Sequence, residues 1–202
     1  MELSGFSYWG ILLALASYGL GSVSSAILLC RLAGYGDPRL AGSKNPGATN
    51  VMRIGGKKLA ILTLLGDSLK GAVPVAAAVA LNLSQAEVNL VAVSAFLGHL
   101  FPVFFRFKGG KGVATFFGVI IVLNWQLALF AATCWLTSTW AFKISSLSAL
   151  ITAFTIPVYT WHFFPDLFIP LLIVCVLMVI RHHQNIRNLM TGVESSSSSV
   201  AS

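Results

Sequence analysis

The sequence predicts an all-α, polytopic membrane protein with about seven transmembrane helices, its N-terminus outside (periplasmic) and its C-terminus in the cytoplasm. Hydrophobic residues make up 56% of the 202 residues and charged residues only 9%, and the mean hydropathy is +0.84. Apolar segments that approach the roughly 20 residues of a spanning helix recur along the chain. The basic residues gather in segments that would lie on one side of the bilayer.

The predicted helices follow these apolar segments in order. They lie at about residues 8–30, 59–81, 88–105, 113–123, 127–142, 147–161 and 167–180. Residues 113–142 could also form one bent helix, but the polar group at 124–126 favours a hairpin. We expect one integral-membrane domain over residues 1–194, followed by a Ser-rich tail, 195–202, whose low complexity predicts disorder.

The placement of charge supports this span count. With seven spans, the inside segments hold Arg31, Arg39, Lys44, Arg53, Lys57, Lys58, Arg106, Lys108, Lys111, Lys143, Arg181 and Arg187. The outside segments carry Glu2, Glu87 and Asp166 instead. The net charge of +7 therefore follows the positive-inside rule and does not indicate a nucleic-acid partner.

Two inside loops have the composition of a phosphate site. Residues 107–115 alternate glycines and lysines between two apolar segments, and the long loop at about 31–58 is rich in glycine and asparagine. Glycines let backbone N–H groups approach an anion, and lysines add point charges. The pattern predicts a protein that handles a phosphorylated molecule at the bilayer surface.

Three polar groups near the spans are further candidates. Asp67 and Lys70 stand three residues apart in the second span, where they form either a structural ion pair or a contact to substrate. His99 precedes Phe101-Pro102 at the cytoplasmic end of the third span. His182 follows the seventh span beside Arg181 and Asn185.

Several common catalytic and metal-binding patterns are missing from the sequence. Gly112 follows Lys111 where a Walker A loop needs Ser or Thr. The H-x4-D pattern fails at His99 and at His162, and no G-x-S-x-G elbow occurs. The three cysteines lie in apolar segments without metal-ligand spacing. We therefore expect no activated nucleophile, metal or cofactor.

Blocks distributed over nearly the whole chain resemble the bacterial acyl-phosphate-dependent glycerol-3-phosphate acyltransferases of PlsY type. The matching blocks are residues 37–53, Asp67 with Lys70-Gly71, residues 98–102, residues 108–115, and Arg181-His182 with Asn185, Gly192 and Glu194. Because several independent motifs occur in the family's order, the resemblance is far more specific than any one of them.

The resemblance implies transfer of a fatty acyl group from acyl phosphate to the 1-hydroxyl of sn-glycerol 3-phosphate, giving lysophosphatidic acid. It also implies a bacterial inner-membrane enzyme whose active site faces the cytoplasm, and a soluble acyl-phosphate-forming enzyme (PlsX type) as a partner. An acyl phosphate is already activated, so direct attack without an acyl-enzyme is expected. The alternative is a transporter for phosphate or an organophosphate, although no internal repeat supports it.

The resemblance also assigns site residues. The expected catalytic residues are Ser43, Lys111, His182 and Asn185. The expected substrate-binding residues are Arg39, Gly42, Asn45, Gly47, Thr49, Asn50, Arg53, Lys70, His99, Lys108, Gly109, Gly110, Gly112, Ser145, Ser146, Arg181 and Glu194. The 42–50 loop is expected to hold acyl phosphate, whereas Arg53, Lys111, His182 and Asn185 would bind glycerol 3-phosphate.

Overall fold

The computed structural model describes residues 5–194, which are folded mainly into helices. Contacts divide the chain into two compact units, Met1–Leu123 and Asn124–Ser202, and each is described by itself. The Ser-rich segment 195–202 lies outside the described residues. The single domain over 1–194 stays a prediction.

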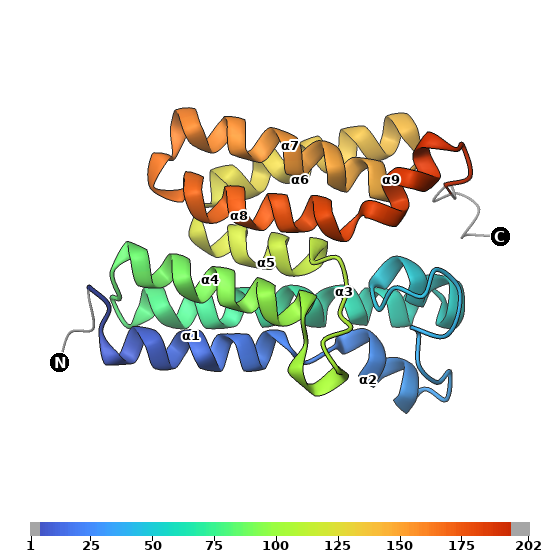
Figure 1. Cartoon of the computed structure of the whole chain (residues 1–202), viewed down its shortest axis with the longest axis horizontal. Coiled ribbons are helices and arrows are strands. Elements are labelled where there is room, and N and C mark those ends of the chain that lie inside the picture. The colour runs from blue at the N-terminus through green and yellow to red at the C-terminus, as the bar shows by residue number, and fades with distance from the viewer. Residues whose placement is uncertain (1–4, 195–202) are drawn as a thin grey trace. The chain divides into compact units, whose positions relative to one another are not determined.

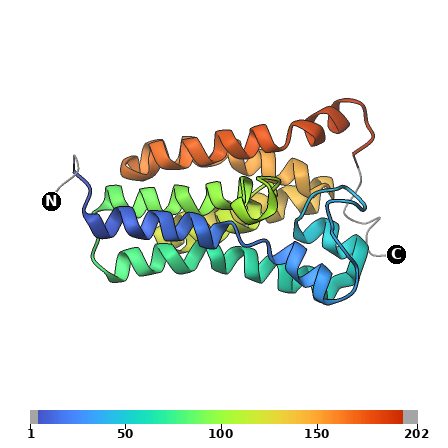
Figure 2. The ribbon, with the colours of Figure 1, turned by 60° about the horizontal axis from the view of Figure 1, so that its bottom comes forward.

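The first unit is built on three long helices. Its elements are α1 (Tyr8–Gly21), α2 (Ser25–Leu32), α3 (Ala48–Ala80), α4 (Gln85–Leu100), the 3-10 turn η1 (Val103–Phe105) and α5 (Val113–Leu123). Helices α1, α3 and α4 run side by side, and α5 packs against α3 (Figures 1 and 2). Their core consists of small and β-branched side chains such as Ala14, Val75 and Val91. Small side chains let helices approach closely, which favours packing inside a bilayer.

The first predicted span is two helices. Segment 8–30 was expected to be continuous, but α1 ends at Gly21 and α2 starts at Ser25. The Ser24 side chain accepts a hydrogen bond from Ile27 N at 3.4 Å, so a serine cap restarts the helix. The break frees the Val23 carbonyl, which accepts a hydrogen bond from Lys70 Nζ at 2.7 Å.

Helix α3 starts eleven residues before the predicted span, at Ala48 rather than at residue 59. Its first turns carry Arg53, Lys57 and Lys58, which are exposed, so a hydropathy pattern cannot reveal them as helical. The helix is interrupted at Gly56, whose φ of 80° and ψ of −179° are non-helical. The predicted long loop at 31–58 is therefore shorter, and it runs from the end of α2 to Gly47.

The second unit contains α6 (Trp125–Phe142), α7 (Ser145–Phe163), α8 (Pro165–Arg181) and α9 (His183–Met190). Helix α7 packs against both α6 and α8. Helix α9 leaves α8 at an angle of 56°, a bend that Figure 1 shows at the red end of the ribbon. The Asn124 side chain caps α6 by accepting from Leu127 N at 2.9 Å, so α5 and α6 are separate helices and not one bent helix.

Within the described residues, three helical segments are long and apolar enough to cross a membrane: Tyr8–Leu32, Ala48–Ala80 and Gln85–Phe105. A fourth is added if the bent pair of α8 and α9 forms one span, and Val113–Leu123 is a shorter apolar helix. All seven predicted apolar segments are thus helical, whereas the number of spans and their orientation stay predictions.

Candidate functional site

The expected site residues fall into two groups, one in each unit. The first group occupies the loop before α3, the first turns of α3, and the loop between α4 and α5, with Lys70 further along α3 and His99 near the end of α4. The second group lies at the start of α7, around the junction of α8 and α9, and at Glu194 after α9. Sequence motifs far apart in the chain thus meet within each unit.

Asn50 organises the loop that precedes α3. Its side chain is buried, and its Oδ1 accepts from Ser43 N at 2.8 Å. Its Nδ2 donates to the carbonyls of Pro38 at 2.9 Å and Ala41 at 3.0 Å. Gly42 has a φ of +56°, and a Cβ there would collide with Asn50 Oδ1. Asn50 therefore shapes the loop from inside, and its direct contact to substrate stays a prediction.

Other expected ligands in this loop face outward. Ser43, Thr49 and Arg53 are exposed, and Asn45 and Gly47 are half-buried. Gly47 is the N-cap of α3, so the N–H groups of the first helical turn point toward this loop. Unpaired N–H groups at a helix start favour an anion.

The loop between α4 and α5 is packed tightly onto the end of α4. Gly109 and Gly110 are buried, and Gly110 N donates to the His99 carbonyl at 3.2 Å. A Cβ on Gly109 would collide with the carbonyls of His99 and Leu100, and one on Gly110 would collide with the His99 ring. Lys111, between these glycines and Gly112, is half-buried. Close backbone packing therefore sets where Lys111 stands.

This loop begins with a strained turn. Arg106 and Phe107 are consecutive non-glycine residues with φ of 57° and 58°. The left-handed region costs roughly 1–2 kcal/mol per such residue. A turn of this kind persists only where surrounding contacts hold it.

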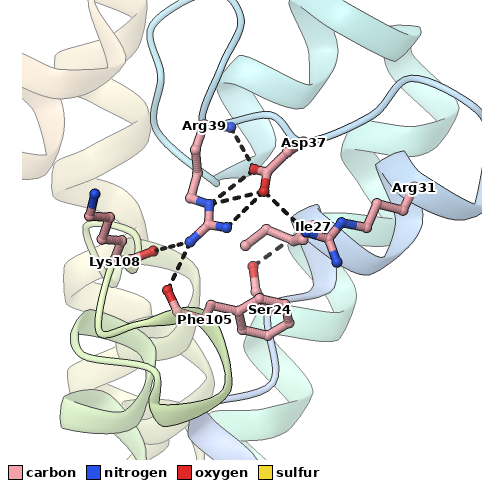
Figure 3. A network of polar contacts seen from close by, with 7 residues as sticks. All are labelled: Ser24, Ile27, Arg31, Asp37, Arg39, Phe105 and Lys108. Atoms are coloured by element: carbon pink, nitrogen blue, oxygen red, sulfur yellow. Dashed lines mark hydrogen bonds and ion pairs between the residues drawn. The ribbon is translucent and has the colours of Figure 1, made fainter.

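Arg39 links the two loops (Figure 3). Its Nη1 donates to the Phe105 carbonyl at 2.8 Å and to the Lys108 carbonyl at 3.4 Å. Its Nη2 and Nε donate to the carboxylate of Asp37, with Nη2 at 2.7 Å from Oδ2. Arg31 at the end of α2 reaches the same carboxylate at 3.3 Å. Asp37 was not among the expected site residues, although its spacing to Arg39 fits the local turn in which Arg39 N donates to Asp37 Oδ1 at 3.0 Å.

The hydrogen bond from the Arg39 guanidinium lowers the pKa of Asp37 to about 2, and the same pair raises the pKa of Arg39. A lowered carboxyl pKa contributes stability above the ordinary value of 3.8 that is lost as the pH falls through about 2. The link between the loops is therefore intact throughout the neutral and mildly acidic range.

His99 and Lys70 lie inside the first unit. Lys70 Nζ is 2.9 Å from Asp67 Oδ1, so the ion pair that the spacing allowed is present. His99 Nδ1 is 3.1 Å from Thr115 Oγ1 and 3.9 Å from Asp67 Oδ1. This buried network connects α3 to the ends of the 101–112 loop, which favours the structural interpretation of Lys70. The sequence does not indicate the contact that Thr115 makes with His99. It shows only that Thr115 is the last residue of the glycine-lysine stretch.

Glu194 connects two expected ligands in the second unit. Its Oε1 accepts from Ser146 Oγ at 2.6 Å and from Asn185 Nδ2 at 2.5 Å. Asn185 is only 9% exposed, and its Oδ1 is buried with no hydrogen-bond partner among residues 5–194. A buried amide oxygen in this state is suited to accept a hydrogen bond from a ligand.

His182 lies at the bend between α8 and α9 and is buried. Its Nδ1 is 2.8 Å from the Met178 carbonyl. A carbonyl only accepts, so at this contact the proton is on Nδ1. Two further expected ligands are half-buried. Arg181 directly precedes His182, and Ser145 is the first residue of α7.

The sequence profile of the glycerol-3-phosphate acyltransferase family matches residues 11–192. This chain belongs to that family. It is similar to the acyltransferase of Pasteurella multocida (strain Pm70), with 51% identity over 188 residues that cover 93% of this chain and 94% of the relative. The family member of Actinobacillus pleuropneumoniae serotype 5b (strain L20) is 52% identical over 183 residues, or 91% and 93% of the two chains.

Two solved structures of the family are also similar. They are crystal structures of PlsY (YgiH), an integral membrane glycerol 3-phosphate acyltransferase, in a glycerol 3-phosphate form and a lysophosphatidic acid form. The first has a TM-score of 0.88 and 33% identity, and the second has 0.85 and 32%. Each covers 93% of this chain and 95% of the other. The acyltransferase family predicted from sequence motifs is confirmed, and so is an all-α integral membrane protein.

Proposed function

We propose that this protein transfers a fatty acyl group from acyl phosphate to the 1-hydroxyl of sn-glycerol 3-phosphate, giving lysophosphatidic acid in the first step of phospholipid synthesis. The observation that supports it most is family membership together with two glycine-rich loops whose backbones are held in place next to cationic side chains. Both substrates carry phosphate, and such loops suit phosphate.

The residues divide between the two substrates. The loop from Gly42 to Asn50 supplies N–H and hydroxyl donors for acyl phosphate, with Ser43 exposed for this purpose. Arg53 and Lys111 bind the phosphate of glycerol 3-phosphate. The family resemblance implies that His182 and Asn185 serve the same acceptor, and the unpartnered Oδ1 of Asn185 suits a hydroxyl.

The reaction needs no covalent intermediate. The acceptor hydroxyl oxygen attacks the acyl carbon, the bond from that carbon to the phosphate oxygen breaks, and the hydroxyl proton ends on the released phosphate. Phosphate is a good leaving group, so the protein's contribution is to hold the two substrates in attack geometry and to stabilise charge.

We expect sequential kinetics and no acylated protein when purified enzyme is incubated with radiolabelled acyl phosphate alone. Acyl phosphate and acyl-CoA are assayed separately with glycerol 3-phosphate, and only the former should give lysophosphatidic acid. Replacing Cys30, Cys134 and Cys175 together by Ala should leave turnover within about twofold, because no thiol takes part. Ping-pong kinetics or a label trapped on Ser or Cys would contradict direct attack. Accumulation of phosphate in proteoliposomes without product would support a transporter instead.

We further propose seven spans in the bacterial inner membrane, with the motif loops in the cytoplasm, where a soluble acyl-phosphate-forming enzyme (PlsX type) would deliver the donor. The one-sided placement of basic residues supports this orientation. Single cysteines at Lys44, Arg106 and Glu194 in a cysteine-free background should react with a membrane-impermeant maleimide only after the cells are opened. Labelling of any of the three in intact spheroplasts would overturn the orientation.

A further inference from the structure

We infer that Arg39 is a positioning residue that holds the strained turn at Arg106–Phe107 closed and so sets the position of Lys111. The inference rests on the proposed function only in giving Lys111 a phosphate to bind. It replaces the expectation that Arg39 itself binds substrate.

The guanidinium of Arg39 is occupied by protein groups. Its Nε and Nη2 donate to both oxygens of Asp37, at 3.0 Å, 3.3 Å and 2.7 Å. Its Nη1 donates to two backbone carbonyls, those of Phe105 and Lys108. The charge is neutralised by a carboxylate that Arg31 contacts as well. A guanidinium used in this way has little capacity left for a phosphate.

The two carbonyls that Arg39 bonds lie on either side of the left-handed pair. Phe105 precedes Arg106, and Lys108 follows Phe107, so one nitrogen spans the whole turn (Figure 3). The guanidinium carbon also lies 5.9 Å from the centre of the Phe105 ring. Inside the turn, Lys108 N donates to the Phe105 carbonyl at 3.2 Å. Arg39 therefore braces the turn from another loop. Its contacts stabilise a backbone conformation that is unfavourable for non-glycine residues.

Lys111 follows this turn by only three residues. Between them stand Gly109 and Gly110, which are buried against the end of α4. Because the backbone of those glycines packs closely against α4, we expect a change of the turn to be passed on to the lysine. Asp37 belongs to the brace, since it fixes the guanidinium that spans the turn.

The test separates the geometry of residue 39 from its charge. Arg39→Lys keeps the charge but loses the planar guanidinium, whose several N–H donors contact Asp37 and both carbonyls at once. We therefore expect it to lower kcat/KM about as much as Arg39→Met, roughly tenfold in each case. A phosphate ligand would behave differently, with Arg39→Lys much milder than Arg39→Met. Near-wild-type kinetics for Arg39→Lys would overturn the inference.

A second substitution tests the strain itself. Phe107 is 57% exposed, and glycine adopts a positive φ readily, so Phe107→Gly alone should change kcat/KM by less than about twofold. In the Arg39→Met background, the same change should restore activity at least roughly threefold, because the turn no longer needs its brace. Equal effects of Phe107→Gly in both backgrounds would contradict the inference.

Limited trypsin digestion gives a readout that does not need the reaction. Cleavage after Arg106 and Lys108 should be faster in Arg39→Met than in wild type, and Phe107→Gly should slow it again toward the wild-type rate in that background. Unchanged cleavage in Arg39→Met would overturn the brace even if activity falls. If the wild-type protein makes no product from any donor, the proposed function fails, whereas this digestion still decides whether Arg39 holds the turn.

Discussion

Lys111→Met is expected to lower kcat/KM about tenfold or more, whereas Lys111→Arg should retain most of the activity. Lys111 is half-buried beside glycines that leave no room for other side chains. Methionine fills similar space without charge, so we expect the substitution to remove the proposed charge-assisted hydrogen bond to phosphate, worth about 1.5–3 kcal/mol. Initial rates at varied glycerol 3-phosphate give the effect.

Lys58→Met is the matched control, since Lys58 is an exposed lysine on α3 outside the expected site. It should leave kcat/KM within about twofold of wild type. Thermal unfolding in detergent should give the same midpoint for both methionine variants. Equal activity of Lys111→Met and wild type would remove Lys111 from the phosphate site.

Gly109→Ala is expected to be about as damaging, for a steric reason. Its added Cβ would collide with the carbonyls of His99 and Leu100, which are backbone atoms that cannot swing away as a side chain can. Overpacking of this kind costs typically 1–3 kcal/mol. The loop must shift and carry Lys111 with it, so kcat/KM should fall roughly tenfold or more.

Gly19→Ala in α1 controls for the substitution itself, because a Cβ there meets nothing within 4 Å. This variant should be as active and as stable as wild type. If Gly109→Ala were fully active, the loop could move without displacing the lysine, and the close packing on α4 would have no role in catalysis.

The sequence was sufficient to locate seven helical segments because apolar runs are a direct consequence of a lipid environment, but it did not predict α9, which follows the last apolar run. It placed the start of α3 wrongly, since Arg53, Lys57 and Lys58 occupy exposed helical turns that carry no hydrophobic pattern. The break between α1 and α2 was missed for a related reason. Ser22 and Ser24 are tolerated within an apolar helix, and only the cap at Ser24 marks the new start.

The candidate site was predicted as a set of residues but not as a set of roles. From its residue type and its glycine-rich surroundings alone, Arg39 is expected to bind phosphate. Its partners are the carboxylate of Asp37 and two backbone carbonyls, and backbone atoms leave no trace in the choice of amino acid. Glu194 and Asn185, nine residues apart, are brought together with Ser146 by the bend after α8, which composition does not reveal.

The ion pair inside α3 has a consequence for how the chain is made. Asp67 and Lys70 are one helical turn apart, so each neutralises the other as soon as that turn forms. An isolated charge of either kind would oppose insertion by about 2.5–3.5 kcal/mol at the centre of a helix. The remaining bond of Lys70 goes to Val23, which is synthesised before α3. The part of α3 that follows Lys58 can thus enter the bilayer as a neutral unit during translation, without waiting for any helix that follows it.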